Sequence, residues 1–210
     1  MTVQFPLLLA TTNSGKVREI RRLLPADVPL LTLADLPPIA EPEESGETFA
    51  ANALLKARAY AAASGLVTIA EDSGLVVDAL GGAPGVHSAR YPGDTYPDKF
   101  KHLYDALATH PRPWTARYVC AVVIIEVPRS RGPEVPESVL FSAEGTCEGE
   151  IWPEPRGPHG FGYDPIFYFP EFGKTFGEVA DDAKLAVAHR GHAFRQVADW
   201  LRATLPARPR

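Results

Sequence analysis

Two spacings of apolar residues alternate along this chain, and they predict a succession of strands and helices. The continuous apolar run at 5–10 predicts a buried strand. The apolar positions that follow at intervals of three and four predict a helix from about Val17 until Pro25 ends it. The Ala-rich stretch at 48–64 contains no helix breaker before Gly65, so it predicts a helix with a glycine stop.

The second half of the chain shows the same alternation. Apolar positions at helical spacing predict three further helices, over 96–110, 181–188 and 193–205. The β-branched apolar residues at 116–127 predict a central strand, and the segment 139–146 is expected to pair with it as the other arm of a hairpin. We assign no chemistry to the polar turn at 128–136 between them, and we expect residues 206–210 to form a frayed tail.

One stretch, at 67–80, combines a strand pattern with adjacent carboxylates. Its apolar start leads into Glu71, Asp72 and then Gly74, which predicts a strand that delivers both carboxylates to its carboxyl end. Because glycine permits a sharp backbone turn, we expect the chain to turn at Gly74 and to resume as a strand over 75–80. Taken alone, Asp72 and the serine after it also fit a simple turn in which the side chains bond the local backbone.

A polar turn separates the first predicted strand from the first predicted helix. Asn13 or Ser14 is the candidate N-cap of that helix. Backbone N–H groups and the positive end of the helix dipole converge at such a turn, which suits a phosphate, and Lys16 adds a mobile cation. Strand–turn–helix units without a ligand are common, so the turn by itself is weak support for a phosphate site.

Two further segments combine candidate chemistry with simpler structural roles. Asn52 and Lys56 are four residues apart on a predicted helix and form a polar stripe, and Glu47 before them either favours the helix dipole or binds a metal. The loop at 157–167 is rich in glycine and aromatic residues. An aromatic face beside the carboxylate of Asp164 suits a nucleobase, but the loop fits an aromatic core plug around a turn equally well.

Composition and charge restrict the class of protein. The chain has 210 residues, of which 45% are hydrophobic and 22% charged, so it is long enough to form one large domain or two lobes with a shared core. Cys120 and Cys147 have no paired spacing, which favours buried reduced thiols in the cytoplasm. No signal peptide or bilayer-spanning apolar run is present. The net charge of −5 argues against a nucleic-acid or anionic-membrane partner.

Six groups of residues, in order along the chain, together carry a resemblance to a known family. They are 10–16 (ATTNSGK), Glu47-Thr48-Phe49 with Asn52 and Lys56, 71–75 (EDSGL), Gly81 and 83–85 (APG) with 88–91 (SARY), 160–167 (GFGYDPIF), and Lys184 with 189–191 (HRG). The chain resembles the inosine triphosphate pyrophosphatase family, the Ham1-like pyrophosphatases of non-standard purine nucleoside triphosphates. The combination is specific, although no single piece is.

The resemblance implies a fold, an activity and a cofactor. The fold would be α/β, with an elongated mixed β-sheet, flanking helices, two lobes within a single domain over 1–210, and an active-site cleft between the lobes. The activity would be Mg²⁺-dependent hydrolysis of ITP, dITP and XTP to the monophosphate and pyrophosphate, which cleanses the nucleotide pool. The protein would be a homodimer.

The resemblance also implies roles for particular residues. Asp72 looks like the general base and a metal ligand, with Glu47 and Glu71 beside it at the metal. The set implied to hold the triphosphate consists of Thr11, Thr12, Asn13, Ser14, Gly15, Lys16, Lys56 and Ser73. The set implied to recognise the base consists of Phe161, Gly162, Tyr163, Asp164, Lys184, His189 and Arg190.

Three positions depart from the family pattern. Glu71 stands where the family usually has Asp, and its longer side chain makes it the least secure of the implied metal ligands. Leu185 and Ala188 stand where the family tends to have Asn and Ser, so polar contacts near the base would be lost. We expect such losses to alter substrate preference more than rate.

Selectivity among purines follows from hydrogen bonding in this scheme. Hypoxanthine and xanthine present an O6 acceptor and an N1–H donor, and adenine reverses both. Arg190 or a backbone N–H at O6, with Asp164 at N1–H, would accept the first pair and discriminate by about 10⁴ against adenine.

The competing class is a non-catalytic nucleotide sensor on the same fold. A structural or RNA-associated module conflicts with the acidic charge balance.

Overall fold

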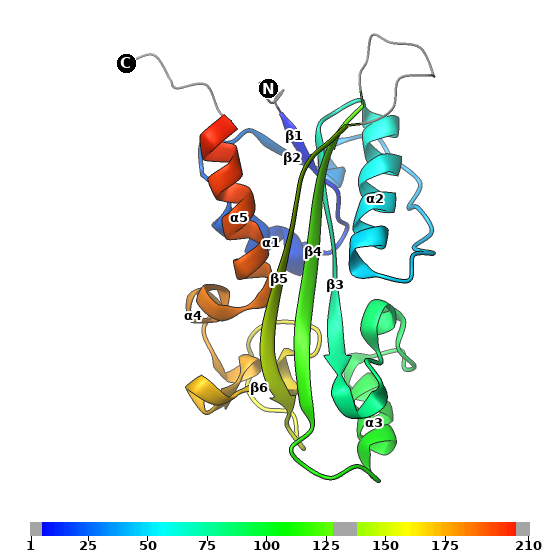
Figure 1. Ribbon diagram of the computed structural model, residues 1–210, viewed down its shortest axis with the longest axis vertical. Helices are drawn as coiled ribbons and strands as arrows, with labels where there is room; N and C mark the ends of the chain where they lie inside the picture. The colour runs from blue at the N-terminus through cyan, green and yellow to red at the C-terminus, as the bar shows by residue number, and fades with distance from the viewer. Residues whose placement is uncertain (1–5, 128–137, 205–210) are drawn as a thin grey trace. The chain divides into compact units, whose positions relative to one another are not determined.

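A mixed β-sheet organises the chain. The structure is a computed structural model that describes residues 6–127 and 138–204 (Figure 1). The strands are β1 (Leu7–Leu9), β2 (Leu30–Thr32), β3 (Thr68–Val77), β4 (Thr115–Glu126), β5 (Ser138–Ile151), β6 (Phe167–Phe169) and β7 (Lys174–Thr175). Over the described residues they form one seven-stranded sheet in the order β2-β1-β3-β4-β5-β6-β7. β1 runs parallel to β2 and β3, whereas β6 runs antiparallel to β5 and β7.

Helices connect most of these strands. The α-helices are α1 (Ser14–Leu23), α2 (Phe49–Ser64), α3 (Tyr96–Leu107), α4 (Asp181–Val187) and α5 (His189–Thr204). Short 3-10 helices are η1 (Leu33–Asp35), η2 (Asp78–Leu80), η3 (Gly85–Arg90), η4 (Asp164–Ile166), η5 (Pro170–Phe172) and η6 (Phe176–Glu178). The predicted mixed α/β sheet with flanking helices is confirmed. In the described part of the chain, no helix combines the length and the apolar character needed to cross a membrane.

The chain divides into two compact units. The first comprises Met1–Asp72, Ala121–Glu144 and His192–Arg210, and the second comprises Ser73–Cys120 and Gly145–Gly191. The boundaries fall inside β3, β4, β5 and α5, so each of these elements contributes one end to each unit. The grouping of both units into a single two-lobed domain stays a prediction.

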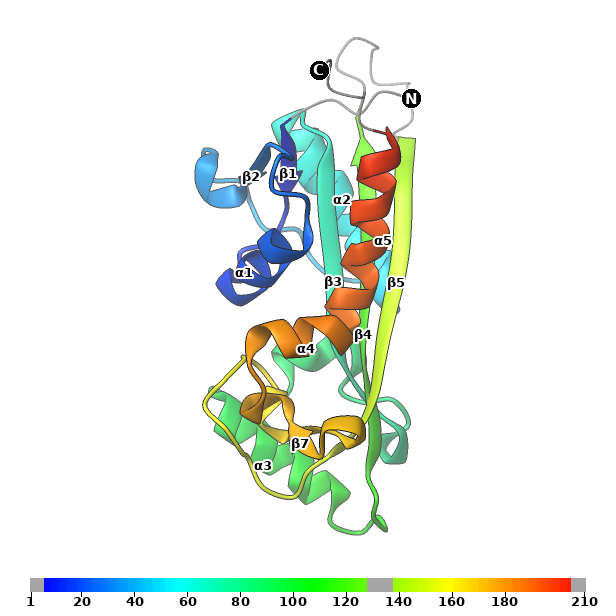
Figure 2. The same cartoon turned by 90° about the vertical axis from the view of Figure 1, so that its left-hand side faces the viewer.

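The core of the first unit forms where α2 packs on the strands. Small residues on one face of α2 allow a close approach, and they contact apolar side chains of β1, β3 and β4 (Figure 2). The contributing α2 residues are Ala53, Ala57, Tyr60 and Ala61. The Thr48 hydroxyl caps the helix by accepting from the Ala51 N–H at 3.1 Å, and Gly65 ends it in the left-handed conformation with φ 67°. Both termini are therefore as the sequence predicted.

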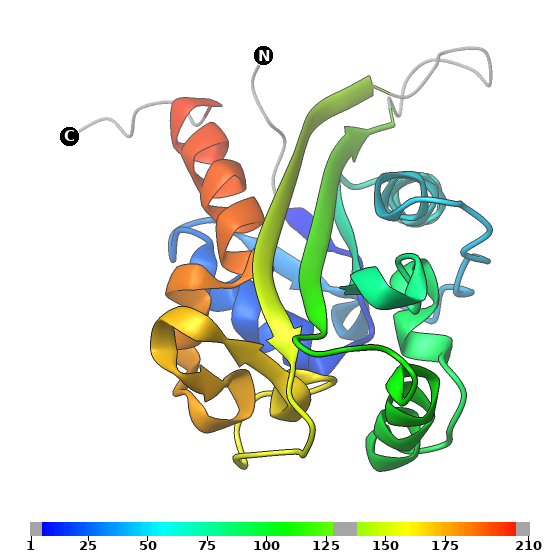
Figure 3. The same ribbon diagram turned by 60° about the horizontal axis from the view of Figure 1, so that its bottom comes forward.

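The core of the second unit is aromatic. Apolar residues of β3 and β4 pack there against α3 and against the segment from β6 to η6 (Figure 3). Tyr118 lies 4.4 Å from Phe167 and 6.3 Å from Phe176, measured between ring centroids. The two free cysteines are both buried, as expected.

Two boundary predictions are wrong. β3 continues without a turn through Gly74 as far as Val77, and residues 78–80 form a 3-10 helix instead of a strand. β1 pairs with β3 at Thr68 and Ile69, before the glycine, so β4 is the neighbour along which β3 continues, and this pairing outweighs the turn preference of a single glycine. The last helix begins at His189 and not at 193. The predicted turn at 128–136 and the tail at 206–210 lie outside the described residues.

Candidate active site

Two carboxylates in the middle of β3 are each paired with a lysine. Consecutive residues of a strand point to opposite faces of the sheet, so Glu71 and Asp72 take different partners. Lys16 of α1 lies 2.5 Å from Glu71 Oε1, and Lys56 of α2 lies 2.9 Å from Asp72 Oδ1. These four residues belong to the first unit, and the structure thus brings together side chains from three separate elements.

Asp72 is buried and oriented by two donors. Lys56 Nζ donates to Oδ1, and Asn52 Nδ2 donates to Oδ2 at 3.3 Å. Asn52 is itself fixed, because its Oδ1 accepts from the Gly46 N–H at 2.8 Å. A side chain at Gly46 would stand 2.7 Å from that oxygen, so glycine permits the close approach. The i,i+4 stripe of Asn52 and Lys56 on α2 therefore holds one carboxylate.

Burial and charge act against each other in this cluster. Burial raises the pKa of the Asp72 carboxyl above its usual value, and Glu71 adds to the rise, although Lys56 and Lys16 oppose it. For Lys56, burial lowers the pKa, but Asp72, Glu71 and Glu44 outweigh burial and leave the pKa raised. Lys56 therefore keeps its positive charge, and Asp72 is a stronger base than an exposed aspartate.

Glu44 completes this cluster, and sequence reasoning missed it. Lys56 Nζ donates to Glu44 Oε1 at 2.6 Å, whereas Glu47, the predicted metal ligand, is exposed on the surface just before α2. Four glutamates crowd residues 41–47, and nothing in their spacing shows which one points inward. The i,i+4 spacing of Asn52 and Lys56 and the strand pattern that leads into Asp72 were sequence signals for the cluster, but neither indicated Glu44.

The first turn of α1 has the features of an anion site. Asn13 caps the helix by accepting from the Lys16 N–H at 3.1 Å, as one of the two predicted caps, and no acidic residue lies in the first turn. Thr11 Oγ1 accepts from the Asn13 N–H at 3.2 Å and shapes the turn. The positive end of the helix dipole therefore lies on the element that presents Lys16. The neighbouring predicted residues Thr12 and Ser14 are exposed, and Gly15 is buried.

A second cluster, in the second unit, is built around a buried ion pair. Lys184 Nζ lies 2.5 Å from Asp164 Oδ2, and both side chains are almost fully buried. The Phe161 N–H donates to the same oxygen at 2.8 Å, and Lys184 also lies 5.0 Å from the centre of the Phe161 ring. Gly160 has φ 75° and a Cβ there would stand 2.1 Å from the Asp164 carboxylate, so the loop requires glycine at this point.

The remaining predicted base-binding residues surround this ion pair. Arg190 lies 5.6 Å from the centre of the Phe161 ring and donates to Ser73 Oγ at 2.9 Å. His189 stacks on Tyr118 at 4.5 Å, and the Tyr118 hydroxyl donates to Asp164 Oδ1 at 3.4 Å. Tyr118 was not predicted, because an aromatic residue within an apolar strand gives no sequence signal of a polar role.

Tyr163 differs from its neighbours in the predicted set. Its side chain is 3% exposed, and its hydroxyl donates to the Ser88 carbonyl oxygen at 2.9 Å. Gly162 lies beside the Tyr96 ring. The structure thus brings together four members of the predicted set: Phe161, Asp164, Lys184 and Arg190. Tyr163 is instead part of the buried core.

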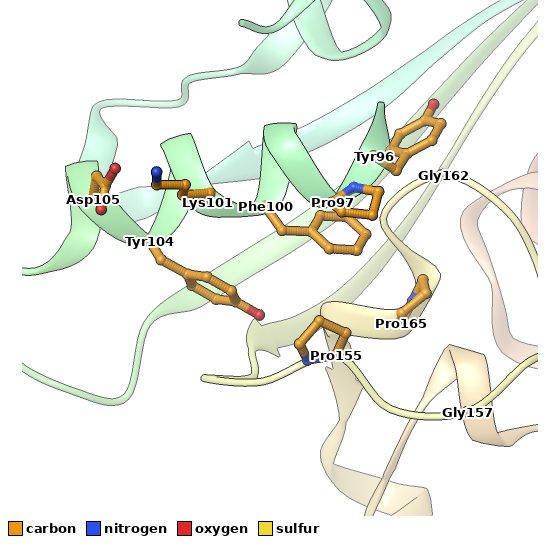
Figure 4. A pocket seen from close by; sticks show the side chains of 10 residues that line it. All are labelled: Tyr96, Pro97, Phe100, Lys101, Tyr104, Asp105, Pro155, Gly157, Gly162 and Pro165. Atoms are coloured by element: carbon orange, nitrogen blue, oxygen red, sulfur yellow. The ribbon is translucent and has the colours of Figure 1, made fainter. Parts of the chain in front are cut away.

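A pocket of about 720 Å³ opens next to this loop, also in the second unit. Tyr96, Phe100 and Tyr104 of α3 form one wall, and Pro155 and Pro165 belong to the opposite wall (Figure 4). Among the predicted site residues it includes Gly162 alone.

The carboxylate oxygens around Lys56 are ligands that a hard divalent cation prefers. Within the described residues, no three His, Cys, Asp or Glu side chains gather closely enough to hold a metal ion by themselves. Glu44 and Asp72 nevertheless converge on one cationic atom, Lys56 Nζ, at 2.6 and 2.9 Å. Mg²⁺ is commonly bound by one or two carboxylates that act together with substrate phosphates, and this pair fits that pattern.

Fold and site together define a class of protein. The first cluster, with its lysines, carboxylates and helix N-terminus, is suited to phosphate, and the second, with a buried ion pair among aromatic rings, is suited to an aromatic group. Residues 7–200 match the Ham1 family, and the chain belongs to that family.

Individual relatives agree with this assignment. The chain is 42% identical over 201 residues to the dITP/XTP pyrophosphatase of Desulforamulus reducens, an alignment that covers 93% of this chain and 94% of the relative. It is 46% identical over 191 residues to the dITP/XTP pyrophosphatase of Gloeobacter violaceus, covering 91% of each. The solved structure of a HAM1 protein from Coxiella burnetii superposes with a TM-score of 0.81 at 35% identity, covering 95% of this chain and all of that one.

Proposed function

We propose that this chain hydrolyses dITP, ITP and XTP to the corresponding monophosphate and pyrophosphate. The relatives named as dITP/XTP pyrophosphatases support the substrate class. The observation that carries the chemistry is Asp72, a buried carboxylate of raised pKa that Lys56 and Asn52 orient. A site that only bound phosphate would need lysines and N–H donors, but it would have no use for a buried base.

Each residue of the first cluster has a role in this proposal. Lys16 and the first turn of α1 bind phosphate oxygens, and Lys56 neutralises charge on the group that is attacked. Asp72 removes the proton from the attacking water. Its Oδ2 atom is the better acceptor, because the bond from Asn52 at 3.3 Å is longer and weaker than the bond from Lys56 to Oδ1.

Glu44 and Asp72 are the residues that we propose to hold Mg²⁺. They already share one cation, Lys56 Nζ, so a divalent ion would meet two carboxylates as the lysine turns to the phosphates. When bound, the metal would supply positive charge to the phosphates and lower the pKa of a bound water. Glu71 pairs with Lys16 and is proposed as an outer partner, and the exposed Glu47 is the weakest of the original candidates.

The second cluster is proposed to recognise the purine. Phe161 offers an aromatic face, and Arg190 offers a donor for O6. The Asp164 carboxylate suits an N1–H donor, a group that adenine lacks. Lys184 and the Phe161 N–H both contact Oδ2 of that carboxylate. Asp72 and Ser73 are consecutive in the chain, so one peptide bond joins the two clusters.

Pyrophosphate release tests the proposal. The purified protein would be assayed with dITP, XTP, dGTP and dATP, with Mg²⁺ and with the metal chelated. We expect pyrophosphate and monophosphate from dITP and XTP in the presence of metal, and kcat/KM for dATP at least about 10²-fold lower. Release of orthophosphate would show cleavage of a different bond. Comparable values for dITP and dATP would contradict the proposed base recognition.

A nucleotide sensor on the same fold is the alternative function. It would bind dITP in the same assay without releasing pyrophosphate. The buried Asp72 argues against it, because a negative charge beside the phosphates weakens binding unless it takes part in a reaction.

Two further proposals concern the state of the protein. The resemblance to the family suggests a homodimer, which sedimentation at equilibrium would test. The two buried free thiols are consistent with a reducing compartment, so we place the protein in the cytoplasm, a location that cell fractionation would check.

A further inference from the structure

Ser88 is the centre of a buried hydrogen-bond relay in the second unit. Its hydroxyl accepts from the Leu75 N–H at 2.8 Å and donates to the Gly85 carbonyl at 2.6 Å. Its own carbonyl accepts from the Tyr163 hydroxyl at 2.9 Å. The relay therefore runs from the loop of the second cluster, through η3, to β3.

The relay ends at Leu75, two residues from Ser73, where the second cluster makes another contact with β3. Arg190 donates to Ser73 Oγ, and Leu75 lies on the same stretch of β3. The loop with Phe161 and Asp164 and the helix with Arg190 are thus both tied to one strand. Because β3 has β4 as its sheet neighbour and is buried over most of its length, it is a rigid reference for both attachments.

Tyr163 is placed to act through this relay and not on a ligand. It is buried, its ring packs against Tyr96 at 5.4 Å and Phe100 at 6.0 Å, and its hydroxyl is already engaged. Burial raises the pKa of the Tyr163 hydroxyl, so that it stays protonated and able to donate throughout the working pH range. Asp164 follows it directly in the chain, so a shift of Tyr163 moves that carboxylate.

We propose that Tyr163 and Ser88 are positioning residues that set the base selectivity of the enzyme by fixing Asp164 relative to Arg190. The inference rests on the proposed function. Selectivity between hypoxanthine and adenine depends on the spacing of the groups that face position 6 and N1, because a misplaced carboxylate loses its bond to the N1–H of hypoxanthine and no longer excludes adenine. Turnover of bound substrate depends on the first cluster, so it should change little.

The test compares Tyr163→Phe and Ser88→Ala with a matched control. Each variant removes one hydroxyl from the relay. The control is Tyr104→Phe, which removes a hydroxyl of the same unit that also donates to a backbone carbonyl, that of Trp152 at 2.9 Å, but that contacts no member of the second cluster. Steady-state kcat and KM for dITP and dATP would be measured for all four proteins, together with their melting temperatures.

We expect KM for dITP to rise about five- to tenfold in Tyr163→Phe and Ser88→Ala, with kcat within about twofold. The ratio of kcat/KM for dITP to that for dATP should fall by a similar factor. In Tyr104→Phe this ratio should stay at the wild-type value, even if its melting temperature falls as much as that of the relay variants. The change in ratio separates positioning from a general loss of stability.

Two results would overturn the inference. An unchanged ratio in both relay variants would make the hydrogen bonds purely structural. A change in Tyr163→Phe without one in Ser88→Ala would exclude the Ser88 hydroxyl from positioning, because Ser88→Ala keeps the backbone carbonyl that accepts from Tyr163. If the wild-type protein releases no pyrophosphate from dITP, the proposed function fails first, and this inference falls with it.

Discussion

The substitution Asp72→Asn separates the catalytic role of this residue from its structural cost. The variant keeps the shape of the side chain and can still accept a hydrogen bond from Lys56, but it removes the negative charge and the basic oxygen. Loss of a general base lowers kcat by roughly 10²–10⁴. This corresponds to about 3–5 kcal/mol of activation free energy.

We expect Asp72→Asn to change the free energy of unfolding only slightly, and to raise it, although the same substitution lowers kcat. Burial of two ions costs several kcal/mol per ion, and the attraction between charges about 3 Å apart near a protein surface returns a similar amount. The raised pKa of Asp72 shows that burial prevails at this carboxyl. We therefore expect the free energy of unfolding of Asp72→Asn at pH 7 to equal or exceed that of the wild type by up to about 1 kcal/mol.

The pH dependence of stability tests the sign of this difference in the free energy of unfolding. A carboxyl with a raised pKa in the folded state contributes stability that is fully present below its unfolded pKa and is lost as the pH rises through its folded pKa. The Asn variant has no such group, so any advantage over the wild type should shrink from pH 7 toward about pH 4. Urea unfolding at both pH values measures the difference.

Asp78→Asn is the matched control. Asp78 lies just after β3, is 43% exposed in its side chain, and pairs with Arg117 and Thr115 away from the first cluster. We expect its kcat to stay within about twofold of the wild type. Near-normal turnover in Asp72→Asn would refute the role of Asp72 as the base. A loss of more than about 2 kcal/mol of stability would show that its attraction to Lys56 outweighs burial.

Three other predictions concern the same two clusters. Because the pKa of Asp72 is raised, kcat/KM for dITP should fall on the acid side at a higher pH than an exposed aspartate would give; a pH–rate profile measures this, and the acid limb should vanish in Asp72→Asn. Glu44→Gln should weaken Mg²⁺ activation about tenfold or more, whereas Glu47→Gln should not, as titration of activity and calorimetry with Mg²⁺ would show; the reverse order would restore Glu47 as the ligand. Gly160→Ala should place a methyl group against the Asp164 carboxylate and lower kcat/KM for dITP about tenfold or more, with a smaller change in kcat; unaltered kinetics would exclude the loop from base recognition.

Local patterns in the sequence determined most of the elements. The Ala-rich run with Thr48 before it and Gly65 after it specifies α2 by propensity and capping, both of which act within a few residues. Asn13 likewise caps α1 through a contact three residues away. The i,i+4 spacing of Asn52 and Lys56 placed two polar side chains on one face of a helix. Such interactions are short-ranged, so the sequence alone reveals them.

Tertiary structure decided the rest, because it depends on partners that are remote in the chain. β3 runs through Gly74 since the neighbouring strand β4 continues beside it, an interaction that overrides a local preference to turn. Glu44, and not Glu47, reaches Lys56 because of the path of the loop before α2, which no spacing rule encodes. Tyr163 is joined to Ser88 across 75 positions of sequence. Periodicity reveals which face of an element is buried, but only the assembled fold shows which polar atoms meet there.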